Sequence, residues 1–116
     1  MIQELTDSNF QTEVLQSDKL AVILFFLPMD PPSNVMMAML NDLSRGYDGT
    51  DYDEKFFMGK VEVLENPAIE KKWKININAV PEILFIKNGN IVDRLTGLVN
   101  KGVVSERIKE KLYADM

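Results

Sequence analysis

The sequence predicts an α/β domain with a mixed central sheet of four to five strands and helices on both faces, in the order βαβαβαββα. Three observations lead to this prediction. Residues 20–27, LAVILFFL, are apolar at every position, which is typical of a central strand covered on both faces. Strand-like and helix-like segments alternate along most of the chain. Finally, Asn88-Gly89 separates two apolar stretches and indicates a two-residue hairpin between antiparallel strands.

The first elements are short. Residues 2–5 are expected to form a strand, and a helix should follow, because Phe10 and Val14 are spaced one helical turn apart. Thr6 or Asp7 is expected to accept hydrogen bonds from the free amides at the start of that helix. The apolar strand then follows.

The start of the second helix is the sharpest local signal. Asp30 precedes Pro31 and Pro32; Asp is a strong N-cap residue, and Pro fits the first helical turn. Gly46 is expected to end the helix in a left-handed cap. The apolar positions between these ends have helical spacing and predict a wide buried stripe. They are Val35, Met36, Met39, Leu40 and Leu43.

The second half of the chain predicts two further helices and three strands. A strand is expected over 55–64, and Asn66-Pro67 should open a short helix as its cap and first residue. Residues 83–86 and 91–95 should pair across the hairpin, and a last helix should begin at Lys101. Ile69 and Trp73 should share one face of the short helix, and the last helix has apolar residues at four-residue steps: Val104, Ile108 and Leu112.

Length, net charge and residue types exclude several classes of function. The length of 116 residues suits one domain over residues 1–116. The net charge of −5 argues against binding to nucleic acid or to an anionic membrane, and the longest apolar run is too short to span one. No signal peptide is visible at the N-terminus, so a cytoplasmic location is expected. The chain has no His and no Cys, which removes the commonest zinc ligands and any disulfide.

Several of these features together resemble the thioredoxin family, from about Leu5 to Leu112. In that family a buried strand leads to Cys-Gly-Pro-Cys at a helix start, and Val80-Pro81 resembles the family's later cis-proline. The resemblance implies that Pro81 is cis and lies beside the active-site loop, where the neighbouring backbone pairs with an extended substrate. Gly97 aligns with a family glycine that lets a partner approach the same groove.

The departures from the family pattern are concentrated at the redox motif. Asp30-Pro31-Pro32-Ser33 stands where the family has Cys-Gly-Pro-Cys, and Met29 replaces the preceding Trp. Leu24 replaces a buried Asp used in proton transfer, and Ala38 replaces a proline that kinks the helix. Thiol–disulfide exchange needs a thiolate nucleophile and a resolving thiol. Because the chain contains no Cys, this chemistry is excluded.

We therefore expect a redox-inactive adaptor or chaperone-like module that binds a protein or peptide through the ancestral groove, with no enzyme activity and no cofactor. Met29 and Met37 are expected to be exposed, whereas Met36 and Met39 are expected in the core. The oligomeric state is left open. The groove residues implied by the resemblance are Met29, Pro32, Val80, Pro81, Gly97 and Leu98.

Asp30 has two interpretations. Its carboxylate retains the negative charge that the family's thiolate places at a helix N-terminus. The simpler interpretation, which we favour, is an N-cap worth about 1 kcal/mol.

Other readings are weaker. Ser33 could stabilise the thiolate of bound glutathione, as a serine does in some glutathione transferases. Alternatively, the chain is a structural subunit or a homodimer.

Two groups of carboxylates do not indicate a site. Asp30 and Glu82 could lie close together, but two carboxylates without a pocket do not make a glycosidase. An acidic loop lacks the glycine and terminal Glu of an EF-hand, so no metal is expected there. Its carboxylates are Asp48, Asp51, Asp53 and Glu54.

Overall fold

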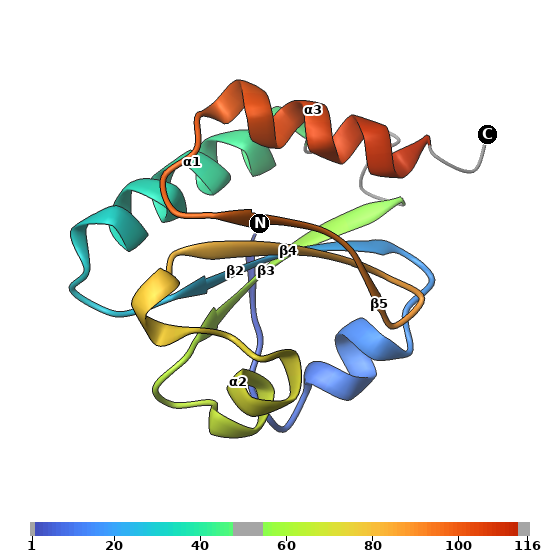
Figure 1. Cartoon of the computed structure of the whole chain (residues 1–116). Coiled ribbons are helices and arrows are strands. Elements are labelled where there is room, and N and C mark those ends of the chain that lie inside the picture. The colour runs from blue at the N-terminus through green and yellow to red at the C-terminus, as the bar shows by residue number, and fades with distance from the viewer. Residues whose placement is uncertain (1, 48–54, 114–116) are drawn as a thin grey trace.

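The computed structural model describes residues 2–47 and 55–113, which form a five-stranded mixed sheet with helices on both faces (Figure 1). The predicted fold class and the predicted order of elements are confirmed. The strand order is β1-β3-β2-β4-β5. The strands are β1 (Ile2–Glu4), β2 (Leu20–Phe26), β3 (Phe56–Glu62), β4 (Glu82–Lys87) and β5 (Asn90–Thr96).

The pairing directions bring distant segments to one end of the sheet. β1, β3 and β2 run parallel, whereas β4 is antiparallel to both β2 and β5. In this register Phe25 lies opposite Glu82, and Glu82 lies opposite Thr96. The chain after β2, the chain before β4 and the chain after β5 therefore leave the sheet at the same end.

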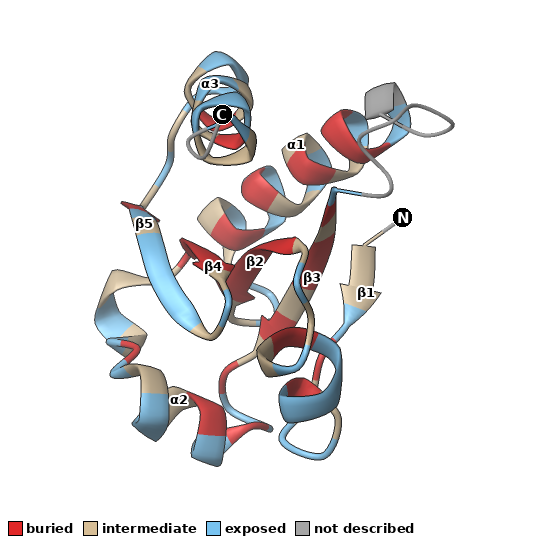
Figure 2. Cartoon of the chain, turned by 90° about the vertical axis from the view of Figure 1, so that its right-hand side faces the viewer, coloured by how far each residue is buried: buried red, intermediate tan, exposed pale blue. Residues whose placement is uncertain are grey.

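Two helical layers cover the sheet. α1 (Pro31–Tyr47) and α3 (Lys101–Leu112) pack on one face, and the short α2 (Pro67–Trp73) and the π-helix η1 (Gln11–Leu15) pack on the other (Figures 1 and 2). A short 3-10 helix, η3 (Ile77–Ala79), precedes β4. As residues 20–27 predicted, β2 is buried on both sides. Its alternate residues enter two clusters: Leu20, Val22 and Leu24 face α1, and Ala21, Ile23 and Phe25 face α2.

The hairpin between β4 and β5 also agrees with the sequence. Asn88 and Gly89 both have positive φ, 53° and 79°, as a type I′ turn requires.

Several local predictions are wrong. Val35 is 55% exposed, and Ser33 occupies the buried position near the start of α1 instead. Met37 packs against the core cluster beneath α1 rather than lying free at the surface. α1 continues past Gly46 to Tyr47, so this glycine lies inside the helix. The first helix has π geometry and begins later than expected, at Gln11.

An ion pair fastens α3 to the edge strand β5. The Arg107 guanidinium donates two hydrogen bonds to the Asp93 carboxylate, at 2.9 and 2.8 Å, and Lys111 Nζ lies 4.0 Å from the same group. The hydrogen bond that Arg107 donates to Asp93, together with the negative charge of Asp93, raises the pKa of Arg107. The guanidinium of Arg107 therefore stays charged at every pH at which the protein is folded.

The acidic loop residues Asp48, Asp51, Asp53 and Glu54 lie outside the described residues. Within residues 2–47 and 55–113, no helix has the length and apolar character needed to cross a membrane.

Candidate functional site: the end of the sheet around Asp30 and Val80

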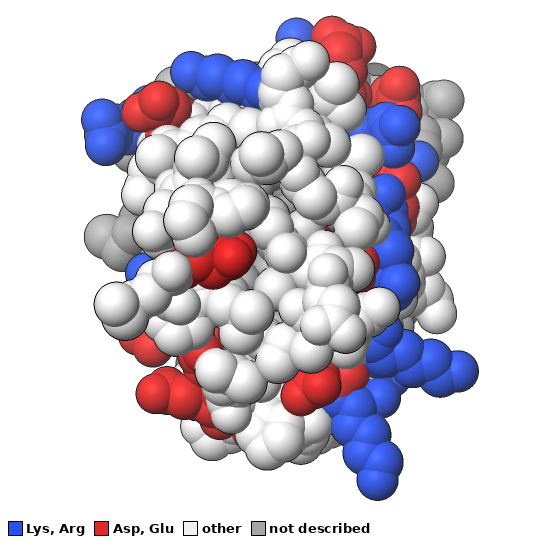
Figure 3. All heavy atoms as spheres, turned by 60° about the vertical axis from the view of Figure 1, so that its left-hand side comes forward, with Lys and Arg blue, Asp and Glu red and all other residues white. Residues whose placement is uncertain are grey.

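The candidate site lies where three connections meet at one end of the sheet: residues 27–30, 78–81 and 97–100 (Figure 1). This is the end at which the sequence places the degenerate redox motif and the groove. Seen from this side, the surface is mainly uncharged, and the Lys and Arg side chains lie along its margins (Figure 3).

Asp30 caps α1 and is locked to Ser33. One carboxylate oxygen, Oδ2, accepts from the Ser33 backbone N–H at 3.1 Å and from the Ser33 hydroxyl at 2.7 Å. The hydroxyl in turn accepts from the Leu27 backbone N–H at 3.2 Å. Ser33 itself is only 1% exposed. The structure thus confirms the capping role of Asp30 and shows that Ser33 closes a small network beneath the loop.

As a result, the N-terminus of α1 has no amide left for a ligand. Pro31 and Pro32 carry no N–H, the Ser33 N–H is taken by the Asp30 carboxylate, and the Asn34 N–H donates to the Asp30 carbonyl at 3.0 Å. A helix N-terminus normally attracts an anion through these free groups. Here Asp30 supplies the anion internally.

Leu24, which stands where the family has a buried Asp, is fully buried on the α1 side of the sheet with Met36 and Leu40. The position is therefore an ordinary part of the apolar core. An ionised carboxyl group there would have to lose its water without gaining a partner.

The connection before β4 presents unpaired backbone. The Val80–Pro81 peptide bond is cis, and the Gly97 N–H donates to the Pro81 carbonyl at 2.8 Å. Val80 is extended, with φ −71° and ψ 150°. Among the residues that the structure describes, neither its N–H nor its carbonyl makes a hydrogen bond. An extended residue with both groups open can pair with another strand.

The groove residues that the sequence predicted differ in their exposure. Met29 is 93% exposed and Leu98 is 60% exposed, whereas Pro32, Val80 and Gly97 are half-buried. Pro81 is buried, so a partner at this surface would meet the Val80 backbone rather than the Pro81 ring. Met29 has a φ of 59°, in the left-handed region that non-glycine residues seldom adopt. Met29 is thus the most exposed large apolar side chain of the described residues, and its backbone conformation carries some cost.

Glu82 adjoins this site, but it serves the sheet. It is 4% exposed and alternates onto the α2 face with Leu84. Its Oε2 accepts from the Thr96 hydroxyl at 3.2 Å, and its Oε1 lies 3.5 Å from Arg94 Nε. The carboxylate is thus directed to side chains of β5, in line with the rejection of a hydrolytic pair with Asp30. Its burial could not be foreseen, because a Glu in an apolar strand gives no sign of which face it occupies.

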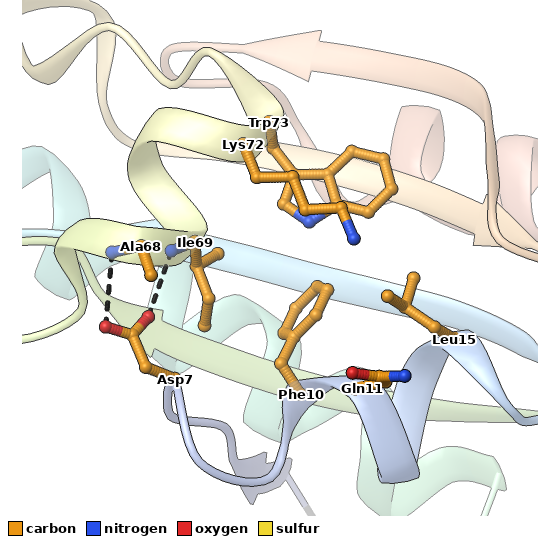
Figure 4. A pocket seen from close by; sticks show the side chains of 8 residues that line it. All are labelled: Asp7, Phe10, Gln11, Leu15, Ala68, Ile69, Lys72 and Trp73. Carbon is orange, nitrogen blue, oxygen red and sulfur yellow. Dashed lines mark hydrogen bonds between the residues drawn. The ribbon is translucent and has the colours of Figure 1, made fainter.

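A separate shallow hollow lies between η1 and α2, on the other face of the sheet (Figure 4). The Phe10 and Trp73 rings face each other across it, with centroids 6.0 Å apart, and Lys72 Nζ lies 5.7 Å from the Trp73 ring centroid. At one end the Asp7 carboxylate accepts from the backbone N–H groups of Ala68 and Ile69, at 3.1 and 2.9 Å (Figure 4).

The Asp7 side chain therefore caps α2, whereas we expected Thr6 or Asp7 to cap the helix that follows directly. Asn66 and Pro67 are the N-cap and the first residue of α2, as expected, but the Asn66 side chain makes no capping hydrogen bond. Instead the Asn66 side chain accepts from the Asp7 N–H at 2.9 Å and donates to the Glu62 carbonyl at 2.8 Å. The contacts at this hollow hold the N-terminal segment against α2, and we assign them to stability.

No group of three or more acidic side chains that could hold a metal ion occurs among residues 2–47 and 55–113. The fold, the strand-to-helix junction at Asp30 and the Val80–Pro81 loop beside the end of β5 define an α/β domain with the thioredoxin fold.

Comparison with known proteins identifies the family. The family model described as Thioredoxin matches residues 1–110. The chain is 33% identical over 109 residues to "Thioredoxin" of Chlorobaculum thiosulfatiphilum, and the match covers 94% of both chains. It is 31% identical over 109 residues to "Thioredoxin 2" of Chlorobaculum tepidum, again with 94% of both chains covered. "Thioredoxin 1" of Nostoc sp. is 28% identical over 109 residues, covering 94% of this chain and 95% of that protein. The chain belongs to the thioredoxin family, as a member without cysteine.

Proposed function

We propose that this chain is a redox-inactive thioredoxin-like module that binds an extended protein or peptide segment, as an adaptor or chaperone-like protein of the cytoplasm. The binding surface is the end of the sheet described above. It comprises Met29, Pro32, Val80, Gly97 and Leu98, with Pro81 buried beneath, and we call it the Val80 surface.

One observation supports this proposal above all others: the open N–H and carbonyl of Val80. A backbone donor and acceptor in an extended residue can form a short ladder with an incoming strand, and such pairing is independent of the partner's sequence. Specificity then depends on side-chain contacts, for which Met29 and Leu98 offer exposed apolar surface.

The chemistry of the family cannot accompany this binding. The chain has no thiol to attack a disulfide, so a bound segment would be held without covalent exchange. The buried Leu24 agrees with this, because a site without exchange chemistry needs no buried carboxyl group for proton transfer.

The geometry does not favour the glutathione hypothesis. A serine that stabilises a thiolate must donate its hydroxyl proton to the ligand. The Ser33 hydroxyl is buried, and its single proton is already donated to Asp30.

The test is the selection of peptides from a displayed library of random linear peptides, followed by affinity measurement on synthetic copies by fluorescence anisotropy. Leu98→Asp and Met29→Asp should each weaken binding about tenfold or more, since burial of one such side chain is worth about 1.5–3 kcal/mol. Val92→Asp is the matched control: Val92 is 39% exposed, and it lies on β5 away from the end that carries Leu98.

Amide shifts of the isotope-labelled protein locate the contact. On addition of a selected peptide, we expect the Val80 amide resonance to move into the range of a paired strand. Selected peptides that bind all four proteins equally, or that leave the Val80 amide unchanged, would refute the proposed surface.

A further inference from the structure

We propose that the segment bound at the Val80 surface carries a Lys or Arg side chain next to its apolar residues, and that this cation pairs with the free carboxylate oxygen of Asp30. The inference rests on the proposed function and adds the chemistry of the partner.

The first support is the state of the Asp30 carboxylate. Both hydrogen bonds that it receives go to Oδ2. Its Oδ1 has no hydrogen-bond partner in the described part of the chain, and it is not among the buried unpartnered oxygens there. Nor does any Lys or Arg of the described residues form an ion pair with Asp30. One oxygen is therefore open to solvent and to a ligand.

The second support is the sign of the charge around it. Five connections leave the sheet at this end: residues 5–10, 27–30, 63–66, 78–81 and 97–100. Together they contain three acidic residues, Asp7, Asp30 and Glu65, and no Lys or Arg. Figure 3 agrees, since acidic atoms interrupt the uncharged face whereas the cations gather at its margins. A cationic side chain reaching this surface therefore meets no Lys or Arg on the connections themselves; along the chain the nearest is Lys101, at the start of α3.

The third support is that the N-terminus of α1 cannot attract an anionic ligand. The free amides that would have drawn a negative ligand to α1 are absent or already bonded, as described above. With Asp30 in place, the local charge seen by a ligand is negative. The substitution of Asp for the family's cysteine has thus left a fixed carboxylate at the position of a reactive sulfur.

The fourth support is rigidity. Ser33 is buried and bonds to both Asp30 and Leu27, so the carboxylate is held in one orientation before a ligand arrives. An ion pair at an exposed surface usually gains little, because two flexible side chains must be ordered. Here only the partner's side chain has to be ordered.

The test uses Asp30→Asn. Asn is as good an N-cap as Asp, so this variant retains the helix start and removes only the charge. We expect peptides selected on the wild-type chain to be enriched in Lys or Arg at one position beside their apolar residues. Asp30→Asn should weaken the binding of such a peptide about fivefold at low salt. The same loss should appear for the wild-type chain when 0.5 M salt is added, at which the ion pair is screened.

A double-mutant cycle tests whether the peptide's basic residue pairs with Asp30. With the peptide's basic residue changed to Gln, Asp30→Asn should make less than a twofold difference. Glu65→Gln is the matched control, because Glu65 lies at the same end of the sheet and bears the same charge. It should leave the affinity within twofold.

The outcomes separate this inference from the proposed function. The ion pair with Asp30 is refuted if peptides bind at the Val80 surface without a basic position, or if Asp30→Asn leaves their affinity unchanged. Either result leaves the proposed peptide binding in place. If no peptide is selected, both proposals are refuted. Both are also refuted if the chain sediments as a dimer that Met29→Asp dissociates, because another copy of the chain then occupies the surface.

Discussion

The Asp30 carboxylate receives both the backbone N–H and the hydroxyl of Ser33, at 3.1 and 2.7 Å, so the two ends of the former redox motif are in direct contact. The resemblance to the family aligns these positions with its two cysteines. Hydrogen bonds thus join the two side chains at the positions where the resemblance would place a reversible disulfide.

This contact predicts that the double variant Asp30→Cys/Ser33→Cys forms an intrachain disulfide and gains dithiol-dependent insulin reduction. The reason is that two thiols at these positions would lie side by side at a helix start. Mass spectrometry measures the disulfide, and insulin precipitation measures turnover. Each single variant serves as a control and should be inactive, because it has only one of the two thiols that the reaction needs. A double variant whose thiols stay reduced in air would show that the loop no longer holds them together.

Met29 should be replaceable by Gly with a gain in stability. Its φ of 59° is unfavourable for a side chain but not for Gly, so Met29→Gly should raise the free energy of unfolding by about 1 kcal/mol. Urea denaturation measures this, with Met29→Ala as the control that retains the strain. The same Gly variant should bind selected peptides more weakly. If Gly and Ala prove equally stable, the left-handed backbone carries no measurable cost.

The carboxyl group that the family buries should be harmful here. Leu24→Asp should lower the free energy of unfolding by at least about 3 kcal/mol at pH 7, because the position is fully enclosed by apolar side chains. Burial would raise the pKa of this Asp above its unfolded value of about 4. The charge-dependent part of the loss therefore develops as the pH rises above 4 and is absent below it. Leu24→Asn has a similar shape and should show no such pH dependence in urea titrations at pH 3.5 and 7.

Asp7→Ala should destabilise the protein by about 1–2 kcal/mol in urea, since it removes the acceptor of two backbone N–H groups at the start of α2. Asp7→Asn retains one acceptor and should lose less. Equal stability of the wild type and the Ala variant would contradict the capping role. Amide exchange of Ala68 and Ile69 should quicken in the Ala variant before that of the core strands.

Arg107→Gln should lower the urea midpoint, because it breaks the two hydrogen bonds to Asp93 that join α3 to β5. The pKa of Arg107 is raised, so its stabilising effect is complete below its unfolded-state pKa and is lost only as the pH rises through the still higher folded-state value. The difference between the variant and the wild type should therefore be constant from pH 6 to 9. Lys111→Gln, whose ammonium lies at 4.0 Å, should have a smaller effect. A difference that varies across this range would point to another titrating group.

Much of the fold could be predicted because its signals are local. The continuous apolar run of β2, the Asn88-Gly89 turn and the Asp30-Pro31 helix start each specify a conformation within a few residues. The boundaries were less exact: β3 ends at Glu62, two residues before its expected end. Hydrogen bonding between strands sets such limits, and the sequence of one strand does not record them.

The candidate site was predictable only in its location. The residues at the end of the sheet follow from the resemblance, but the burial of Ser33 and the exposure of Val35 depend on which side of α1 meets the sheet. A wide apolar stripe allows several rotations of a helix. Packing against α3 and β2 selects one of them, and the Ser33 hydroxyl is tolerated inside because Asp30 and Leu27 satisfy it.

By itself, the sequence determined that this chain has a thioredoxin-like order of elements and no sulfur chemistry, because residue inventory and local periodicity need no knowledge of distant contacts. Only the tertiary structure decided that Asp7 caps a helix some sixty positions along the chain and that the Val80 backbone is left unpaired. Both facts concern which hydrogen-bonding groups find partners. That question is settled between segments remote in sequence, when the sheet and its helices come together.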